Sequence, residues 1–296
     1  MNSFNFNRFG QTLRWVLATN FRKLLAWTIG AALIVFMGEM FIVGINGMNG
    51  HPKPVEMLWD FADIGSGLLT LVAVIMVCSV VSSISEKRKR GTILMLPSSN
   101  LEKFLALVLY TTVICVLCMF LAYVVGDALR MAWLWGEHLM LGQEPVSQVA
   151  MYNGVEKTYY NWSSSLPWML SKLIPHLITV WSSGIYWTWE NEWSTLIYNV
   201  VLAVWVHSVY MLGGTLLRKY AFVATSVVLL GVVTLLNYVL GYFGLPIFMS
   251  GLTTLGVVLC ILLLILSVIN YRASFYIFKG FQLITNKWTN YDILKR

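Results

Sequence analysis

Long apolar runs are the feature that most limits what this chain can fold into. In the stretch VVLCILLLILSVI (257–269), Ser267 is the one polar residue among thirteen. A helix needs about 20 mostly apolar residues to cross a membrane, and several runs reach that length. Strands of a membrane barrel alternate apolar and polar residues, which this stretch does not, so we expect helices. The chain is 58% hydrophobic and 11% charged, whereas soluble domains carry about 25% charged residues.

The apolar runs predict an all-α integral membrane protein with six transmembrane helices. The expected spans are residues 24–45, 61–84, 104–126, 195–217, 221–240 and 249–270. Residues 1–23 place apolar side chains on one helical face and arginines on another, which predicts an amphipathic interfacial helix. The transmembrane domain then covers 24–270, and 271–296 form a cytoplasmic tail. Because polar and aromatic residues precede the first span, we expect no cleavable signal peptide.

Basic residues are distributed unevenly between the segments that join the expected spans. If both termini are cytoplasmic, sixteen of the twenty lysines and arginines lie inside. The four that lie outside are Lys53, Arg130, Lys157 and Lys172. Cytoplasmic segments of membrane proteins carry such an excess, so we expect both termini in the cytoplasm. The net charge of +7 then reflects orientation, and we expect no nucleic-acid partner.

Residues 127–193 form the longest segment between expected spans and hold eight of the thirteen tryptophans. Tryptophan favours the headgroup level of a bilayer. We expect a helical, aromatic-rich outer loop, which is either a plain aromatic belt or an outer gate or surface for a lipid-like substrate. Residues 166–189 are apolar, but Lys172, Pro175 and His176 near their middle make a seventh crossing costly. This piece is expected to be interfacial or re-entrant.

A few polar residues inside the expected spans are candidates for function. Glu39 is the one carboxylate deep in a span, which suggests a proton or substrate role. Together with His207 and Asn237 it marks a possible translocation path, although a hydrogen bond between helices is the simpler explanation for His207. All four cysteines lie in spans, where cysteine behaves as a small apolar residue, so no disulfide is expected.

Motifs of catalysis are missing from the sequence. The chain has no Gly-Lys pair and therefore no phosphate-binding loop for ATP. The four histidines lack the spacing of metal ligands. We expect the chain to hold no cofactor and to have no catalytic activity of its own.

The segment between the second and third spans has more detail than a simple connector needs. Its basic residues are Lys87, Arg88, Lys89, Arg90 and Lys103. Gly91 permits a sharp turn, and residues 92–96 are then a short apolar helix on the membrane surface. Pro97 ends that helix, and Glu102 favours the first turn of the next one. The residues suited to cap the next helix are Ser98, Ser99 and Asn100.

This linker resembles that of permease subunits in the ABC-2 family of ABC transporters, in its bacterial branch. In that family a charged cluster and a Gly-Thr pair follow the second span, and a short coupling helix leads to a Leu/Thr-Pro-x-Ser element. The resemblance assigns the contact with the ATPase to Glu86, Lys87, Arg88, Arg90, Gly91, Thr92, Leu94, Met95, Leu96, Pro97, Ser98, Glu102 and Lys103. It implies a cytoplasmic ABC ATPase that binds ATP, a second permease copy and membrane lipids as partners. It also implies that the chain lies in a bacterial inner membrane.

The function that the resemblance implies is export of a substrate, driven by ATP hydrolysis in the separate subunit. The chain departs from the family pattern in three ways. The stretch from Gly91 to Pro97 is shorter, Leu94 stands where an acidic residue is common, and the long outer segment follows the third span. Two other classes stay open from the residues alone. One is a non-transport assembly or sensor protein in the membrane, and the other is an intramembrane enzyme that modifies lipid through Glu39 or the outer-loop histidines.

Overall fold

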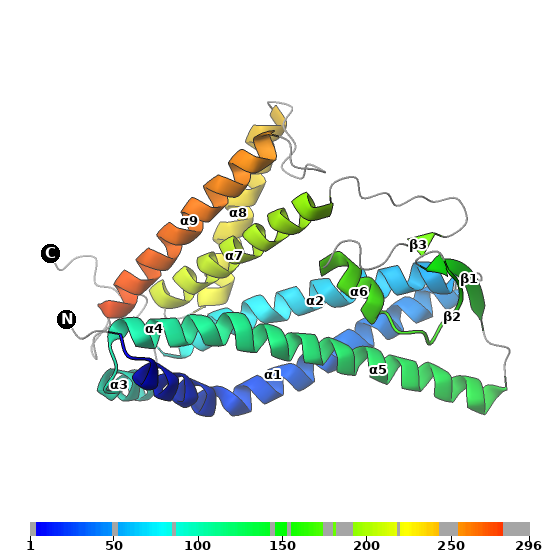
Figure 1. Cartoon of the computed structure of the whole chain (residues 1–296), viewed down its shortest axis with the longest axis horizontal. Helices are drawn as coiled ribbons and strands as arrows, with labels where there is room; N and C mark the ends of the chain where they lie inside the picture. Colours follow the sequence, from blue (N-terminus) through cyan, green and yellow to red (C-terminus); the bar gives the residue numbers. More distant parts are fainter. Residues whose placement is uncertain are drawn as a thin grey trace. The chain divides into compact units, whose positions relative to one another are not determined.

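The computed structural model is helical over most of the residues that it describes (Figure 1). These residues are 4–48, 53–84, 87–142, 146–152, 155–173, 180–181, 192–217, 220–242 and 254–280. They belong to two compact units. Unit 1 consists of residues 1–23, 73–116 and 197–296, and unit 2 consists of residues 24–72 and 117–196.

Four helical stretches in this part of the chain are long and apolar enough to cross a membrane. They are α1 (Phe6–Met48), α2 (Pro54–Ser83), α9 (Thr254–Lys279) and the continuous stretch of α4 (Asn100–Leu109), the π-helix η1 (Tyr110–Ile114) and α5 (Cys115–Leu141). Two shorter apolar stretches lie in α7 (Glu192–Leu216) and α8 (Ala221–Tyr242). The expectation of a largely helical, multi-pass membrane protein is confirmed. The six crossings stay a prediction.

Helix α1 runs without a break from the expected interfacial segment into the first apolar run. It passes from unit 1 to unit 2 between Lys23 and Leu24. In the first part of the helix, Thr12, Val16 and Asn20 are buried. Their spacing of four residues places them on one helical face. Of the expected apolar face, Val16 is buried, whereas Phe6 and Phe21 are exposed. The interfacial position of this segment stays a prediction.

The segment between α5 and α7 differs most from the expectation of a helical outer loop. It contains a three-stranded antiparallel sheet in the order β2-β1-β3, formed by β1 (Ser147–Tyr152), β2 (Val155–Tyr160) and β3 (Val180–Trp181). Helix α5 extends to Leu141 instead of ending at 126. The short helix α6 (Leu166–Leu173) has eight residues, far fewer than a span needs. The rest of the possible seventh span, 174–179 and 182–189, lies outside the described residues.

Small residues bring the helices of unit 2 close together. A Cβ atom added at Gly126 of α5 would lie 2.8 Å from the carbonyl oxygen of Ala32 in α1. On the neighbouring helix α2, a Cβ at Gly65 would lie 2.5 Å from the ring of Tyr123. Close approach at glycine is a common way for membrane helices to pack, because dispersion and hydrogen bonding replace the missing hydrophobic effect.

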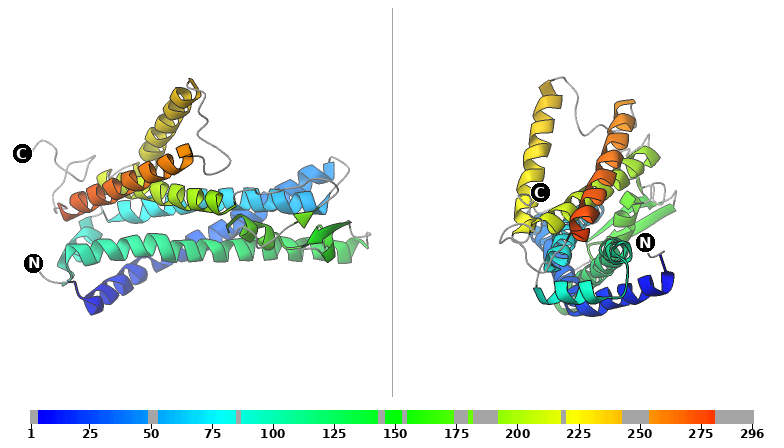
Figure 2. Two further views of the ribbon diagram at one scale, coloured as in Figure 1. Left: turned by 45° about the horizontal axis from the view of Figure 1, so that its top comes forward. Right: turned by 90° about the vertical axis from the view of Figure 1, so that its left-hand side faces the viewer.

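Unit 1 is built from α3 (Lys87–Met95), α4 and η1, α8, α9, most of α7 and the adjoining parts of α1 and α2. The C-terminal part of α9 lies beside α4 (Figure 2), where the ring of Phe104 contacts those of Phe275 and Phe278 at centroid distances of 5.4 and 5.9 Å. Helices α7 and α8 approach at Gly213, where an added Cβ would overlap the side chain of Thr225. These contacts hold the helix that follows the basic linker in a packed unit.

Candidate functional site

The linker between α2 and α4 forms a helix of its own, α3 (Lys87–Met95). The short helix, the proline and a capped helix after it were all predicted. The turn expected at Gly91 was wrong, because Gly91 lies inside α3 with open space around it. Glycine allows a turn but does not impose one, and the lysines and arginines before it are good helix formers.

Helix α4 begins at a complete capping box. Among the three candidate caps, Ser99 is the one used: its Oγ accepts the backbone N–H of Glu102 at 3.2 Å. In return, the Glu102 carboxylate accepts the backbone N–H of Ser99 at 2.8 Å. Both amides would otherwise lack a partner at the helix start. The local sequence therefore fixes where α4 begins.

Glu102 also binds the beginning of the chain, which the sequence did not suggest. Its Oε1 accepts the backbone N–H of Asn5 at 2.9 Å and Nη2 of Arg8 at 3.1 Å. The Glu102 side chain is fully buried by these contacts. The carboxylate thus ties the start of α1 to the junction of linker and α4.

The electrostatics of this junction favour an ionised Glu102, which precedes the apolar run that begins at Phe104. Burial by itself would raise the pKa of Glu102, but hydrogen bonds from Asn5 and Ser99 and the charge of Arg8 outweigh burial and leave the pKa below its ordinary value. Burial lowers the pKa of the neighbouring Lys103, against the opposing effect of Glu102. The junction is therefore a buried cluster of charges joined by hydrogen bonds.

Helix α3 has a buried face and an exposed face. Arg90 and Ile93 are buried, whereas Thr92 is exposed and the side chain of Met95 is 84% exposed. Pro97 is exposed just after the helix. The side chain of Met95 is therefore accessible to another molecule, as are many other apolar side chains of this protein.

The remaining residues of the predicted coupling set lie in α3 or next to it. Lys87, Arg88 and Leu94 lie in α3, but their side chains are outside the described residues, as is the whole of Glu86. Leu96 and Ser98 are half-buried between α3 and α4.

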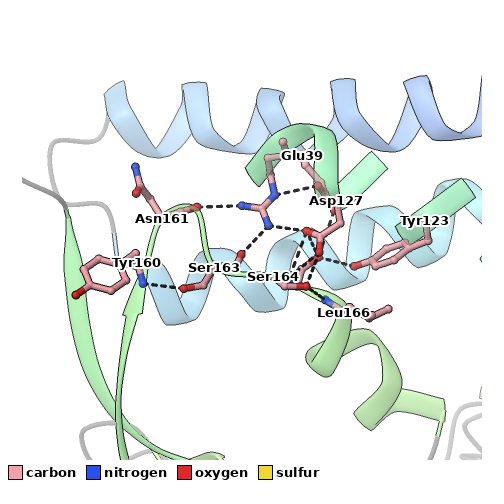
Figure 3. A network of polar contacts seen from close by, with 10 residues as sticks. Glu39, Tyr123, Asp127, Tyr160, Asn161, Ser163, Ser164 and Leu166 are labelled. Atoms are coloured by element: carbon pink, nitrogen blue, oxygen red, sulfur yellow. Dashed lines mark hydrogen bonds and ion pairs between the residues drawn. The ribbon is translucent and has the colours of Figure 1, made fainter. Parts of the chain in front are cut away.

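In unit 2, Glu39 belongs to a buried network of charges (Figure 3). Arg130 of α5 donates from Nε to Glu39 Oε2 at 3.0 Å and from Nη2 to Asp127 Oδ1 at 2.5 Å. The side chains of Glu39 and Arg130 are 0% exposed and that of Asp127 is 3% exposed. The guanidinium also lies 4.4 Å from the ring centroid of Phe61 in α2.

The network extends into the serine-rich stretch after β2. Arg130 donates to the carbonyl oxygens of Asn161 and Ser163 at 2.9 and 2.7 Å. Ser164 donates from Oγ to Asp127 at 2.6 Å, and Ser165 donates to Asp127 from both its backbone N–H and its Oγ. In Figure 3 the carbonyl groups of Asn161 and Ser163 point toward the guanidinium, and the Ser164 hydroxyl points toward the carboxylate of Asp127. The stretch is therefore fastened to α5 through Asp127 and Arg130.

His207 takes part in hydrogen bonds between helices of unit 1. Its Nδ1 lies 2.7 Å from the hydroxyl of Tyr271 in α9, and its Nε2 lies 3.1 Å from Thr111 Oγ1 in η1. The simpler explanation of His207 is thereby confirmed. The side chain of Asn237 in α8 is outside the described residues. Glu39 belongs to unit 2 and His207 to unit 1.

Sequence reasoning missed the partners of both buried carboxylates. Asp127 and Arg130 fell within the expected outer loop, residues 127–193. Their spacing of three residues was an available signal, since opposite charges at i and i+3 share a helical face. Nothing in the sequence pointed from Arg8 to Glu102, which lies 94 positions away.

Comparisons of the chain with protein families, with curated proteins and with solved structures gave no match. Within the described part of the chain, no group of three histidine, cysteine, aspartate or glutamate residues is arranged to hold a metal ion.

Proposed function

We propose that this chain is the membrane-spanning permease subunit of an ABC-2-type transporter. In this proposal a separate cytoplasmic ATPase binds and hydrolyses ATP, and α3 is the element that it contacts. The observation that carries the proposal is helix α3, in which Arg90 and Ile93 are buried and Met95 is exposed. Glu102 caps the start of the next helix, α4.

A linker that served only to orient the chain would not need this construction. Each lysine or arginine near an anionic membrane contributes about 1 kcal/mol, whatever the backbone shape between them. Here the linker is helical, Pro97 follows it, and Ser99 and Glu102 cap α4 reciprocally. In this proposal a displacement of α3 also moves α4, because only residues 96–99 separate the two helices. The contacts of Glu102 with Asn5 and Arg8 extend the same connection to the start of α1.

The membrane arrangement that goes with this function has six spans and cytoplasmic termini in a bacterial inner membrane. Helices α7 and α8 have 25 and 22 residues, which meets the length of about 20 that a crossing needs. With the four longer stretches this makes six. The segment between α5 and α7 then lies outside, and α3 lies inside with most basic residues.

The mechanism follows from the family resemblance. Two permease copies face each other, and ATP-driven dimerisation of the ATPase moves α3. The spans then tilt and open a path for an exported substrate between the copies. The chain itself forms the path and transmits the movement of α3 to the spans, and it carries out no chemical step.

The experiment that tests the coupling role is co-purification of the ATPase subunit with the permease in mild detergent. Met95→Asp is expected to reduce the ATPase recovered per permease about tenfold, because an apolar contact of about 1.4 kcal/mol is lost. The matched control is Met140→Asp, since Met140 is 88% exposed at the far end of α5.

Two outcomes contradict the proposal. One is an unchanged yield of ATPase and unchanged ATPase activity of the complex in Met95→Asp. The other is the failure of any ATPase to co-purify with the wild-type chain, which would favour the assembly or sensor function.

A further inference from the structure

The buried network of unit 2 contains one positive and two acidic side chains. Glu39, Asp127 and Arg130 are all removed from water. If both carboxylates were ionised, the cluster would carry a net charge of −1 in a low-dielectric interior, where an unbalanced charge is strongly disfavoured. The charged or titratable groups that act on Glu39 are Arg130 and Asp127, and Tyr123 lies in the same network. All three come from α5.

Asp127 has the surroundings of an ionised carboxylate. Its two oxygens accept from Arg130 Nη2, from the hydroxyl groups of Ser164 and Ser165, and from the backbone N–H of Ser165. A carboxylate that accepts several hydrogen bonds and an ion pair favours its charged form. Asp127 and Arg130 therefore balance each other's charge.

Glu39 has fewer donors. Its Oε2 accepts from Arg130, but the one partner of Oε1 within the described residues is Ser165 Oγ at 3.4 Å. The single hydroxyl proton of Ser165 has a nearer acceptor in Asp127 Oδ1 at 2.9 Å. The hydroxyl of Tyr123 lies 2.7 Å from the same Ser165 Oγ. If Glu39 were ionised, its Oε1 would therefore lack a hydrogen-bond donor, because the Ser165 hydroxyl donates to Asp127.

We propose that Glu39 is a proton-binding site and holds a proton on Oε1 in this structure. The carboxylic acid then donates to Ser165 Oγ, Ser165 donates to Asp127, and Tyr123 donates to Ser165. A hydroxyl oxygen accepts two hydrogen bonds and donates one, so every group in this chain of contacts is satisfied. The net charge of the cluster becomes zero. The proposal is independent of the coupling role of α3.

Binding of the proton is linked to the serine-rich stretch. Release of the proton places a second negative charge beside Asp127 and removes a donor from Ser165. Both changes weaken the attachment of residues 163–165 to α1 and α5. A proton taken up or released at Glu39 therefore changes how firmly this stretch is held.

Infrared spectroscopy of the purified chain at neutral pH, in a detergent that has no ester or other carbonyl group, tests the protonation directly. The carbonyl band of a protonated carboxylic acid lies above the amide I band and is absent from ionised carboxylates. We expect this band in the wild type and its loss in Glu39→Gln. A wild-type spectrum without the band overturns the proposal with no variant needed, as does a band that survives in Glu39→Gln.

Thermal unfolding provides a second readout. The amide of Glu39→Gln has the shape and donor of the neutral acid, so its Tm is expected to stay within about 2 °C of the wild type. Asp127→Asn removes an ionised group and is expected to lower Tm by about 5 °C or more. If Glu39→Gln lowers Tm as much as Asp127→Asn, Glu39 is ionised and the proposal is wrong.

Discussion

Arg130 holds together three separate stretches of chain in unit 2. It donates to Glu39 in α1, to Asp127 one turn before it in α5, and to two carbonyl oxygens after β2. A guanidinium loses several kcal/mol of hydration when it is buried. The number of acceptors and the ring of Phe61 below it offset that loss. Lysine has the charge but not the planar fork, so it cannot reach all four acceptors at once.

We expect Arg130→Lys to lower the free energy of unfolding by about 3 kcal/mol, because several buried acceptors lose their donor. Unfolding in mixed detergent and SDS, followed by tryptophan fluorescence, measures the change. The control is Lys53→Met, which breaks an exposed ion pair with Glu56. Such pairs contribute less than about 1 kcal/mol. Equal effects of the two substitutions would mean that the buried network does not stabilise unit 2.

Gly213 permits the close contact between α7 and α8. Gly213→Ala is expected to destabilise the protein by about 1–3 kcal/mol, because the new methyl group overlaps Thr225. Gly231→Ala is the matched control within α8, since its Cβ meets nothing within 4 Å. Alanine there favours the helix by up to about 1 kcal/mol. The same unfolding assay compares the two, and a stabilising Gly213→Ala would contradict the packing.

At the scale of elements, the carboxylate of Glu102 anchors the start of α4. Glu102 completes the capping box with Ser99 and binds Asn5 and Arg8. Capping alone is worth about 1 kcal/mol. Because the same group serves two elements, its loss affects both the beginning of α4 and the beginning of α1.

We expect Glu102→Ala to increase hydrogen exchange of backbone amides in the first turns of α4 and α1 about tenfold or more. Mass spectrometry of peptic peptides localises the effect. Glu137→Ala is the control, because Glu137 is an exposed carboxylate whose partner is Trp133 on its own helix. Faster exchange in α4 but not in α1 would show that the start of the chain is held by other contacts.

The same anchor gives a pH dependence of known sign. The pKa of Glu102 is lowered in the folded protein from 4.5, so folding favours the ionised form. The resulting stabilisation is fully present above pH 4.5 and is lost as the pH falls through the folded value. Hydrogen-exchange protection of the backbone amides at the starts of α1 and α4, corrected for intrinsic exchange rates, should decrease in this way as the pH falls in the wild type. In Glu102→Ala this pH dependence should be absent.

Elements that depend on neighbouring residues could be predicted, and contacts between distant residues could not. Pro97, Ser99 and Glu102 act within one or two turns, so the end of α3 and the start of α4 followed from the sequence. The hairpin also had a local signal, because Asn153-Gly154 is a residue pair that favours a tight turn between two strands. It was missed because the tryptophans suggested a membrane cap. The Glu39–Arg130 pair had no local signal, since hydropathy assigns each charge separately.

At the scale of the whole molecule, the orientation in the membrane gives a direct prediction. Single cysteines at Met95 and Glu156, both exposed, are placed in a background without the four native cysteines. In intact cells an impermeant thiol reagent is expected to label position 156 and to reach position 95 only after permeabilisation. The excess of basic residues on the side of Met95 is the physical reason. Labelling of position 95 alone in intact cells would reverse the orientation.

The separation of Arg130 and Glu39 in the sequence, 91 positions, has a consequence for how the protein is made. A ribosome adds about 5 to 20 residues per second, so α1 exists for roughly 5 to 20 seconds before Arg130 is synthesised. Thr28, on the same helix, bonds to the carbonyl oxygen of Leu24 as soon as the helix forms. Glu39 has no ion-pair partner until Arg130 of α5 has been synthesised. Until then its carboxyl group faces lipid or the insertion machinery. Cells that produce this protein therefore have to hold an unfinished first helix until its partner arrives.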